Sequence, residues 1–315
     1  MAGVKRTFDY IIVGAGSAGC VLANRLSANP ANRVLLLEAG GPDTRQEVRI
    51  PAAFTKLFKS EQDWNYTAAA DPASGTPAQF WPRGKMLGGS SSMNAMMYVR
   101  GHRSDYDGWR DHGNPGWGYD DVLPYFRRSE QYAGGDSEFR GADGPLHVGG
   151  LRSPNPLTNV FLAACDQRGM ARNPDYNGAN QDGFAPTQVT QKRGRRWSAA
   201  DAFLRPALGR PNLTIHTGAH ATRVLFEQQV AVGVEYRMNN EIVQAHAERE
   251  VMLCGGAINS PQLLLLSGVG PAGRLRELGI PVVHDLPGVG QNLHDHPLFC
   301  VTYECTRPIT LAGAE

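Results

Sequence analysis

Residues 10–38 read YIIVGAGSAGCVLANRLSANPANRVLLLE, and this stretch decides the fold. The compact apolar run Tyr10–Val13 predicts a strand that ends at a glycine, and residues 18–26 then have the composition of a helix. A second apolar run, Val34–Leu37, predicts another strand, which ends at Glu38. A strand, a glycine turn, a helix and a strand in this order form one βαβ unit, which implies a parallel sheet.

The glycine turn within this stretch is Gly14-Ala15-Gly16-Ser17-Ala18-Gly19, with the spacing G-x-G-x-x-G. That spacing alone is a weak signal, but here it follows a strand, opens a helix and is followed by an acidic residue, Glu38, at the end of the next strand. Gly14 permits the tight turn, Gly16 lets the backbone approach a pyrophosphate, and Gly19 lets the helix pack closely on the strand. The N–H groups at the start of the helix face the phosphate charge, and Glu38 is expected to bind a ribose diol. The pattern predicts a dinucleotide site and disfavours NADP, but it does not separate NAD from FAD.

The remainder of the chain alternates between irregular and regular stretches. Residues 40–118 are rich in Gly, Pro and Trp with little periodicity, which predicts an ordered extended region and no further βαβ layer. A helix is predicted over residues 157–168, and strands, several of them suited to an antiparallel meander, are predicted over residues 213–216, 221–227, 230–238 and 249–254. We therefore expect an α/β fold of the Rossmann type, with a parallel sheet, helices and an antiparallel meander.

The composition is that of a globular chain. Its 315 residues, 41% hydrophobic and 19% charged, suffice for one large core or two moderate ones. A net charge of +1 provides no long-range field for nucleic acid or an anionic membrane, so we expect no nucleic-acid partner. The one basic cluster, Lys192–Arg196, lies in a polar stretch and is expected to be a solvated loop.

The cysteines and histidines predict neither a disulfide framework nor a metal site. The five cysteines, Cys20, Cys165, Cys254, Cys300 and Cys305, are scattered and contain no C-x-x-C pair, which fits a reducing compartment. His294 and His296 flank an aspartate, but three consecutive residues do not ordinarily converge on one ion.

The segment before the first predicted strand, Met1–Asp9, is short and polar and leaves no room for a signal peptide. The longest leucine run, Leu263–Leu266, is far below the ~20 residues that a spanning helix needs. We expect no transmembrane segment and a cytoplasmic location, with peripheral membrane association left open.

Two long motifs lie outside the dinucleotide turn. The first, residues 84–101, reads GKMLGGSSSMNAMMYVRG and is followed by DYD at residues 105–107. Its consecutive small residues offer a concave surface of backbone N–H groups for phosphate and for the carbonyls of a flavin ring, and Asn94 adds an amide. The second, residues 256–270, reads GAINSPQLLLLSGVG and predicts a turn and an apolar helix that is broken at Ser267-Gly268.

With these motifs the chain resembles the amino-terminal, FAD-binding part of the glucose-methanol-choline (GMC) flavoprotein oxidoreductases. Two further segments, RWSAADAFL at residues 196–204 and PGVGQNLHDHP at residues 287–297, are similar to the same family. The resemblance implies a discontinuous FAD-binding domain, residues 1–150 and 195–296, and a partial substrate-binding domain, residues 151–194 and 297–315. The residues expected to bind FAD, with Val224 beside the adenine, are Gly14, Ala15, Gly16, Ser17, Ala18, Gly19, Glu38, Ala39, Met86, Gly88, Gly89, Ser90, Asn94, Ala95, Met96, Met97 and Val224.

The resemblance also implies an activity. It is the oxidation of the CH–OH group of an alcohol by hydride transfer to flavin N5, as in choline and other alcohol dehydrogenases or oxidases, with oxygen, a quinone or another electron acceptor. In this family the catalytic histidine lies in a later segment, and none of the nine histidines here matches its motif. We therefore assign no catalytic residue and expect this chain alone to be inactive.

Three alternatives remain open at this point. One is a flavin-binding lyase similar to the hydroxynitrile lyases of the family, and another is a non-catalytic FAD-binding fragment. A nicotinamide dehydrogenase is disfavoured because it leaves both motifs unexplained. Some family members carry a histidine before the asparagine of the first motif and bond it to the flavin, whereas this chain has Met93 there, so we expect noncovalent FAD.

Overall fold

The computed structural model describes residues 6–296 and 301–309. The chain forms two compact units, of which the first comprises Met1–Ala95 and Arg196–His294 and the second Met96–Arg195 and Asp295–Glu315. The break after Ala95 lies well before the domain boundary expected at residue 150, whereas the return at Arg196 lies one residue from the expected position. The assignment of these units to FAD and to substrate stays a prediction.

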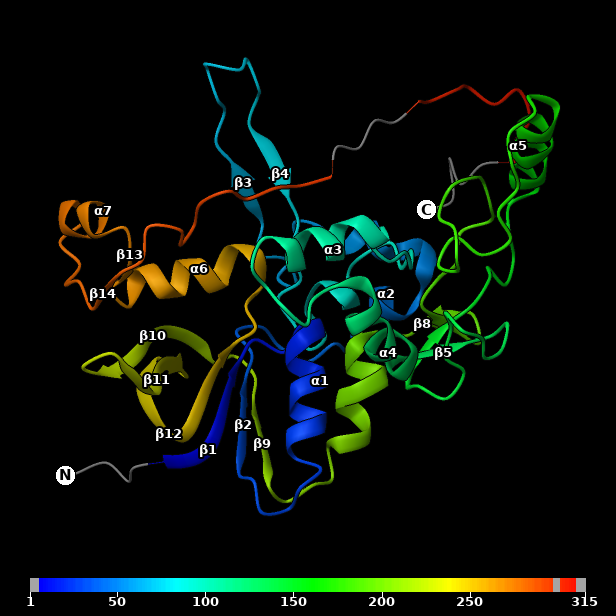
Figure 1. The fold of residues 1–315 in the computed structure, drawn as a ribbon. Coiled ribbons are helices and arrows are strands. Elements are labelled where there is room, and N and C mark those ends of the chain that lie inside the picture. Colours follow the sequence, from blue (N-terminus) through cyan, green and yellow to red (C-terminus); the bar gives the residue numbers. More distant parts are fainter. Residues whose placement is uncertain (1–5, 297–300, 310–315) are drawn as a thin grey trace. The chain divides into compact units, whose positions relative to one another are not determined.

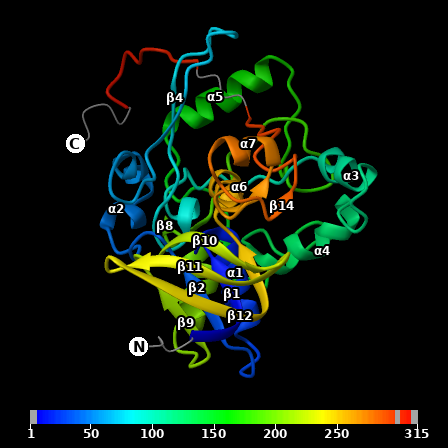
Figure 2. The same ribbon diagram turned by 90° about the vertical axis from the view of Figure 1, so that its left-hand side faces the viewer.

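The first unit is built on a six-stranded sheet with the order β10-β11-β12-β1-β2-β9 (Figure 1). Its strands are β1 (Arg6–Val13), β2 (Val34–Leu37), β9 (Leu213–His216), β10 (His220–Glu227), β11 (Val230–Met238) and β12 (Glu241–Leu253). Strands β12, β1, β2 and β9 run parallel, and β10, β11 and β12 form an antiparallel meander, drawn in yellow in Figure 2. The expected parallel sheet and meander are confirmed, with β9 parallel at the edge beyond β2.

The core of this unit lies on the central strands. All four residues of β2 are buried, as expected of a parallel strand that is covered on both faces. Ile11 and Ile12 of β1 are fully buried, and burial of each such side chain contributes about 1.5–3 kcal/mol. Helix α1 (Ser17–Leu26) follows β1 through the glycine turn and packs against η3 (Ala200–Leu204). The predicted βαβ unit is therefore present, with α1 beginning one residue earlier than expected.

Short elements make up the segment that was expected to be irregular. They are α2 (Gln46–Arg49), η1 (Pro51–Leu57), the paired strands β3 (Tyr66–Ala68) and β4 (Gln79–Trp81), and η2 (Gly89–Ser92).

Helix α3 (Arg103–Asp111), in the second unit, was not predicted. Its start is capped by His102, whose Nδ1 accepts a hydrogen bond from the Ser104 N–H (3.2 Å), while the Asp105 carboxylate accepts one from the His102 N–H (2.7 Å). Histidine is not among the preferred N-cap residues, so no start signal for this helix could be read from the sequence.

The second motif forms a helix directly after β12. Helix α6 (Gly256–Leu266) ends where the Ser267 hydroxyl donates a hydrogen bond to the Leu263 carbonyl (2.5 Å) and Gly268 adopts a positive φ of 86°. The apolar helix broken at Ser267-Gly268 is thus confirmed. The chain then continues through β13 (Val269–Gly270), α7 (Ala272–Glu277) and β14 (His284–Asp285). Earlier in the chain, η3 and η4 (Arg205–Ala207) precede β9.

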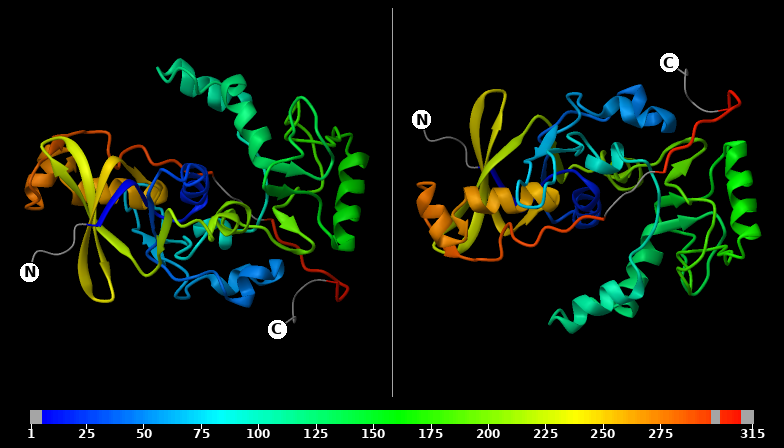
Figure 3. Two further views of the ribbon diagram at one scale, coloured as in Figure 1. Left: turned by 90° about the horizontal axis from the view of Figure 1, so that it is seen from below. Right: turned by 90° about the horizontal axis from the view of Figure 1, so that it is seen from above.

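The second unit contains three helices and two short strands that pair in parallel, and its helices are drawn in teal and green in Figure 3. They are α3, α4 (Tyr119–Ser129), α5 (Pro156–Gln167), β5 (Glu130–Tyr132) and β6 (Leu146–Val148); β7 (Gln191–Lys192) and β8 (Arg195–Arg196) follow. The predicted helix over residues 157–168 is confirmed as α5. Glu130 is fully buried and accepts hydrogen bonds from Arg100 (2.6 Å) and Arg140 (3.0 Å). This buried ion network joins the start of β5 to residues that precede and follow it in the chain.

The prediction of a solvated loop for the basic cluster Lys192–Arg196 is wrong for its last residue. The side chain of Arg196 is 1% exposed, and it donates hydrogen bonds to Val48 O (2.9 Å), Ser91 O (3.1 Å) and Asn94 Oδ1 (2.9 Å). Burial lowers the pKa of the guanidinium to about 10. A run of basic residues does not reveal that one of them has buried acceptors, because those acceptors come from segments about a hundred residues away.

No helix among residues 6–296 and 301–309 is long and apolar enough to cross a membrane. Two of the cysteines, Cys20 and Cys165, are buried, whereas Cys254 and Cys305 are half-buried. Cys300 lies outside the described residues.

Candidate cofactor site

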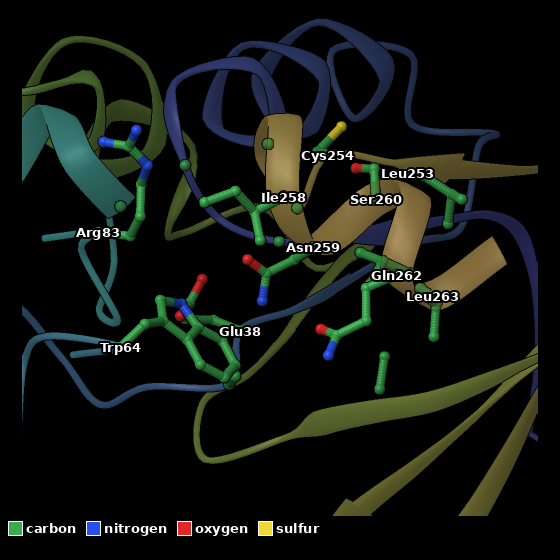
Figure 4. Close-up of a pocket in the computed structure, with 18 of the residues that line it drawn as sticks. Glu38, Trp64, Arg83, Leu253, Cys254, Ile258, Asn259, Ser260, Gln262 and Leu263 are labelled. Carbon is green, nitrogen blue, oxygen red and sulfur yellow. The ribbon is translucent and has the colours of Figure 1, made fainter. Parts of the chain in front are cut away.

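The first unit contains a cavity of about 840 Å³ at the carboxyl ends of β1, β2 and β12. The last residue of each of these strands, Val13, Leu37 and Leu253, lines it. In open α/β sheets, ligands bind outside the carboxyl ends of the parallel strands. The remaining walls come from the glycine turn, β3, the start of the first motif, the start of β10 and the first turns of α6 (Figure 4).

The three glycines of the turn have different surroundings. A Cβ atom at Gly14, whose φ is 101°, would lie 2.6 Å from the Cys254 carbonyl oxygen, and one at Gly19 would lie 1.9 Å from the Gly14 carbonyl oxygen. A Cβ atom at Gly16 would meet nothing nearer than 4.0 Å. The protein itself therefore requires Gly14 and Gly19, whereas at Gly16 a side chain would only fill cavity space. This open surface fits a ligand whose phosphates approach the backbone closely.

Glu38, directly after β2, stabilises the glycine turn through hydrogen bonds. Its carboxylate accepts hydrogen bonds from the Ala15 N–H (2.9 Å) and the Gly40 N–H (2.9 Å), and the residue is 5% exposed. Burial raises the pKa of this carboxyl group, and the two backbone hydrogen bonds oppose that rise. Each carboxylate oxygen has a second lone pair, so Glu38 retains acceptor capacity toward the cavity that it lines.

The first motif packs directly on the glycine turn. A Cβ atom at Gly89, whose φ is 52°, would lie 2.7 Å from the Gly16 Cα atom, so only glycine permits this approach. The Gly88 N–H donates a hydrogen bond to the Ala15 carbonyl (2.7 Å). Helix α1 has no acidic residue in its first turn, which leaves the positive end of its dipole uncompensated beside the cavity. Together these contacts hold the first motif against the glycine turn at the edge of the cavity, and the residues present fit a dinucleotide.

The structure brings together one part of the predicted cofactor-binding set. The predicted residues that line the cavity are Gly14, Gly16, Ser17, Ala18, Glu38, Ala39, Gly89 and Ser90. Ala15, Gly19 and Gly88 support the turn without lining the cavity.

The other predicted residues lie in different surroundings. Met86 is fully buried in an apolar cluster with Val48, Leu57 and Met93, and Asn94 and Ala95 follow η2 without lining the cavity. Val224 is 3% exposed within the core of the sheet, and its N–H donates a hydrogen bond to the Ser267 hydroxyl (2.8 Å). Met96 and Met97 belong to the second unit. Contact of these residues with FAD stays a prediction.

Several residues that line the cavity were not predicted from the sequence. The Trp64 ring stacks on Tyr66 with the ring centres 5.7 Å apart, and the Tyr66 hydroxyl accepts a hydrogen bond from the Asn259 amide (2.8 Å). The His220 ring meets Trp64 edge-on at 5.4 Å, and burial lowers its pKa. Burial raises the pKa of Tyr66.

Figure 4 shows Asn259 and Gln262 extending from α6 into the same space as Glu38, with Arg83 and Trp64 on the left of the view. The second motif reaches this edge of the sheet because β12 pairs in parallel with β1. A strand pairing across more than 200 residues leaves no local signal, which is why the sequence did not place α6 at the site.

Comparisons with known proteins agree with this geometry. Residues 8–298 match the family model described as GMC oxidoreductase. Mitochondrial choline dehydrogenase from Homo sapiens is 49% identical over 316 residues, covering 98% of this chain and 53% of that protein. Oxygen-dependent choline dehydrogenase from Brucella anthropi is 46% identical over 304 residues, covering 96% of this chain and 55% of that protein.

Solved structures give the same result. Pyridoxine 4-oxidase from Mesorbium loti superposes with a TM-score of 0.84 at 38% identity, covering 89% of this chain and 55% of the other. A formate oxidase variant from Aspergillus oryzae, studied for FAD modification, superposes with a TM-score of 0.86 at 31% identity, covering 94% of this chain and 53% of the other. The chain thus spans about half the length of the relatives that it matches. Because the family model matches most of its length and the relatives match nearly all of it, the chain belongs to the GMC oxidoreductase family.

Proposed function

We propose that this chain is the FAD-binding part of an FAD-dependent oxidoreductase that acts on the CH–OH group of an alcohol. The observation that carries the proposal is the cavity at the carboxyl ends of β1 and β2, where an open glycine, Gly16, and a buried carboxylate, Glu38, face the same space. In a dinucleotide site, such a glycine lies beside a phosphate and such a carboxylate accepts hydrogen bonds from a ribose. The names of the choline dehydrogenases and of the formate oxidase support an oxidoreductase with FAD.

Each wall of the cavity has a role in this proposal. The Gly14–Gly19 turn and the start of α1 bind the pyrophosphate through backbone N–H groups. Glu38 accepts hydrogen bonds from the adenosine ribose, and the apolar wall of Leu253, Leu263 and Leu266 borders the adenine. Gly89 and Ser90 hold the chain of the first motif against the pyrophosphate. When bound, FAD would supply the hydride acceptor for the alcohol carbon.

The proposal for the whole protein extends beyond these residues. We infer that the first unit is the FAD-binding domain, that the second unit contributes to a substrate domain, and that the histidine that accepts the alcohol proton lies outside the 315 residues. The substrate class is an alcohol such as choline, in line with the names of the choline dehydrogenases among the relatives. Oxygen, a quinone or another carrier takes the electrons, and a cytoplasmic location stays a prediction from the scattered cysteines.

An anaerobic reduction experiment tests this proposal. The FAD-loaded chain and, where the gene encodes further residues, its longer product are each mixed with choline and with simple primary alcohols. We expect the longer protein to lose its yellow oxidised-flavin absorbance and the 315-residue chain to keep it. Bleaching of the chain alone would show that a base within residues 1–315 suffices. Retention of the colour by the longer protein with every alcohol would instead favour a lyase or a binding module.

A further inference from the structure

Arg83 is a cation in the cavity without an acidic partner. Among the described residues, no carboxylate lies within ion-pair distance of its guanidinium, whose contacts are the neighbouring Pro82 carbonyl (3.0 Å) and the Trp81 ring (5.5 Å). Glu38 is the one carboxylate that lines this cavity, and it already accepts two backbone hydrogen bonds. The sequence did not single out Arg83, which stands one residue before the first motif.

The backbone of Arg83 is held on both sides. Its N–H donates to Asp63 Oδ1 (3.0 Å), and its carbonyl accepts from the Trp64 N–H (2.9 Å). Asp63 is 5% exposed, and its two oxygens also accept from the backbone N–H groups of Lys59 and Asn65 (both 2.9 Å). The Asp63 carboxylate is therefore committed to backbone groups, and the hydrogen bonds on both sides of Arg83 hold its backbone in place.

A short chain of contacts connects Arg83 with the glycine turn. The next residue, Gly84, donates its N–H to the Ser90 hydroxyl (3.2 Å), and Gly89 lies against Gly16. Arg83 thus borders the cavity beside the segment that meets the start of α1. A planar guanidinium binds phosphate oxygens through two parallel hydrogen bonds, which a backbone turn alone does not provide.

We propose that Arg83 binds the diphosphate of the dinucleotide together with the start of α1, and that it makes the cavity select ligands with a diphosphate. The inference rests on the proposed function. It adds a side-chain cation to a phosphate site otherwise built of backbone N–H groups and one helix end. Without Arg83 the residues that line the cavity would retain the carboxylate of Glu38 and no cationic side chain, since His220 has a lowered pKa. The other nearby cation, Lys85, does not line the cavity, and its ammonium lies over the Trp64 ring at 4.9 Å.

The test compares ligands that differ in the diphosphate. Binding of adenosine, ADP and FAD to the 315-residue chain is measured by calorimetry for wild type, Arg83→Gln and Arg83→Lys. Arg223→Gln, which removes a half-exposed cation that pairs with Glu235 outside the cavity, controls for net charge. We expect Arg83→Gln to weaken ADP and FAD about 10-fold to 100-fold. Adenosine should bind all four proteins equally, and Arg83→Lys should lie between wild type and Arg83→Gln.

A measurement on wild type alone covers the case in which a variant does not fold. Arg83 is partly exposed, so an arginine-specific dicarbonyl reagent modifies it, and peptide mass spectrometry reports the extent. ADP should protect Arg83, and adenosine should not. Equal ADP affinity in wild type and Arg83→Gln, or no protection by ADP, would overturn the inference while leaving FAD binding intact. A folded wild-type chain that binds neither ADP nor FAD would overturn the proposed function and this inference with it.

Discussion

At the scale of single residues, Gly16 and Gly19 separate what the fold requires from what the ligand requires. A Cβ atom at Gly19 would lie 1.9 Å from the Gly14 carbonyl oxygen, so Gly19→Ala should destabilise the ligand-free chain by about 1–3 kcal/mol. Gly16 has φ −76° and ψ −159°, which alanine adopts without strain, and no atom lies within 4.0 Å of its added Cβ. Gly16→Ala should therefore leave stability unchanged or slightly raised.

Binding separates the same two substitutions. Gly16→Ala should weaken FAD by at least about 10-fold, because the methyl group holds the pyrophosphate away from the backbone. Urea unfolding of the ligand-free proteins and FAD titration of each measure the two effects. Normal FAD affinity in a stable Gly16→Ala protein would contradict the assignment of this turn to phosphate.

We expect Met93 to leave the flavin noncovalently bound. The side chain is 2% exposed and packs with Val48, Leu57 and Met86, so it belongs to an apolar cluster. A thioether has no imidazole nitrogen with which to bond the flavin ring, and we expect noncovalent FAD. Acid or detergent denaturation of the loaded protein should release all yellow colour through a size-exclusion filter. Flavin fluorescence that stays with the polypeptide would require another nucleophile.

Single residues also show where sequence reasoning ends. The position of Gly16 and Glu38 at the cavity could be predicted because it depends on neighbours within one βαβ unit. Arg83, Trp64 and Arg196 could not, because each acquires its role from segments that are distant in the chain. Arg196 in particular looked like part of a solvated run, and only the fold places buried carbonyls around it.

At the scale of elements, a closed ring of ion pairs joins α2 to η3 and η4. Arg49 contacts Asp43 (3.1 Å) and Asp201 (2.6 Å), and Arg205 contacts the same two carboxylates (2.5 Å and 2.8 Å). The side chains of Asp43 and Asp201 are 2% and 5% exposed, whereas those of Arg49 and Arg205 are 27% and 39% exposed, so the loss of either carboxylate removes charged hydrogen bonds from two partly exposed arginines. The ring holds the short elements of residues 40–57 in place. The periodicity of the sequence does not predict these elements.

Asp201 provides a test with a defined pH dependence. Burial raises its pKa, but hydrogen bonds from Arg205 and Ser198 and the charge of Arg49 outweigh this, so the pKa is lowered overall. A carboxyl group whose pKa is lower in the folded than in the unfolded protein stabilises the native state at pH values above the unfolded pKa. That contribution is lost as the pH falls through the folded-state pKa. Asp201→Asn should cost about 1.5–3 kcal/mol at neutral pH, because it removes charged hydrogen bonds to arginines that stay partly solvated. The difference from wild type should shrink below about pH 4.

The matched control is an exposed ion pair in the same unit. Glu277 is 67% exposed and pairs with Arg274 at 3.0 Å, so Glu277→Gln should change the unfolding free energy by about 0.5 kcal/mol or less. Chemical denaturation at several pH values measures all three proteins. A loss in Asp201→Asn that stays constant with pH would show that the carboxylate charge is not what stabilises the ring.

Element prediction from the sequence succeeded where signals were local. The βαβ unit, α5 and the meander follow from apolar runs and turn residues, whereas α3 and α4 were missed. Helix α3 has a histidine cap and an internal glycine, and α4 starts after Gly118 and contains Pro124. Their stability comes from tertiary contacts such as the edge-on packing of Tyr106 against Phe126 (5.6 Å), which no local pattern encodes.

At the scale of the whole molecule, the chain provides one unit with a dinucleotide-sized cavity and a second unit without an assigned ligand. The Rossmann-type fold could be predicted because the deciding stretch is contiguous. The break after Ala95 could not, since it falls inside the first motif, whose residues 84–95 and 96–101 belong to different units. The FAD-domain boundary expected at residue 150 stays a prediction. The chain spans about half the length of the relatives that it matches.

Titration of the purified 315-residue chain with FAD and with NAD, for wild type and Glu38→Ala, tests the central claim most directly. Circular dichroism must first show that both proteins are folded, because Glu38 also accepts the Ala15 and Gly40 N–H bonds. Charge-assisted hydrogen bonds to the ribose contribute about 1.5–3 kcal/mol, so FAD should bind the variant about 10-fold to 100-fold more weakly. The account predicts that wild type binds FAD and prefers it to NAD; equal FAD affinity in the two proteins, or equal affinity for FAD and NAD, would contradict it.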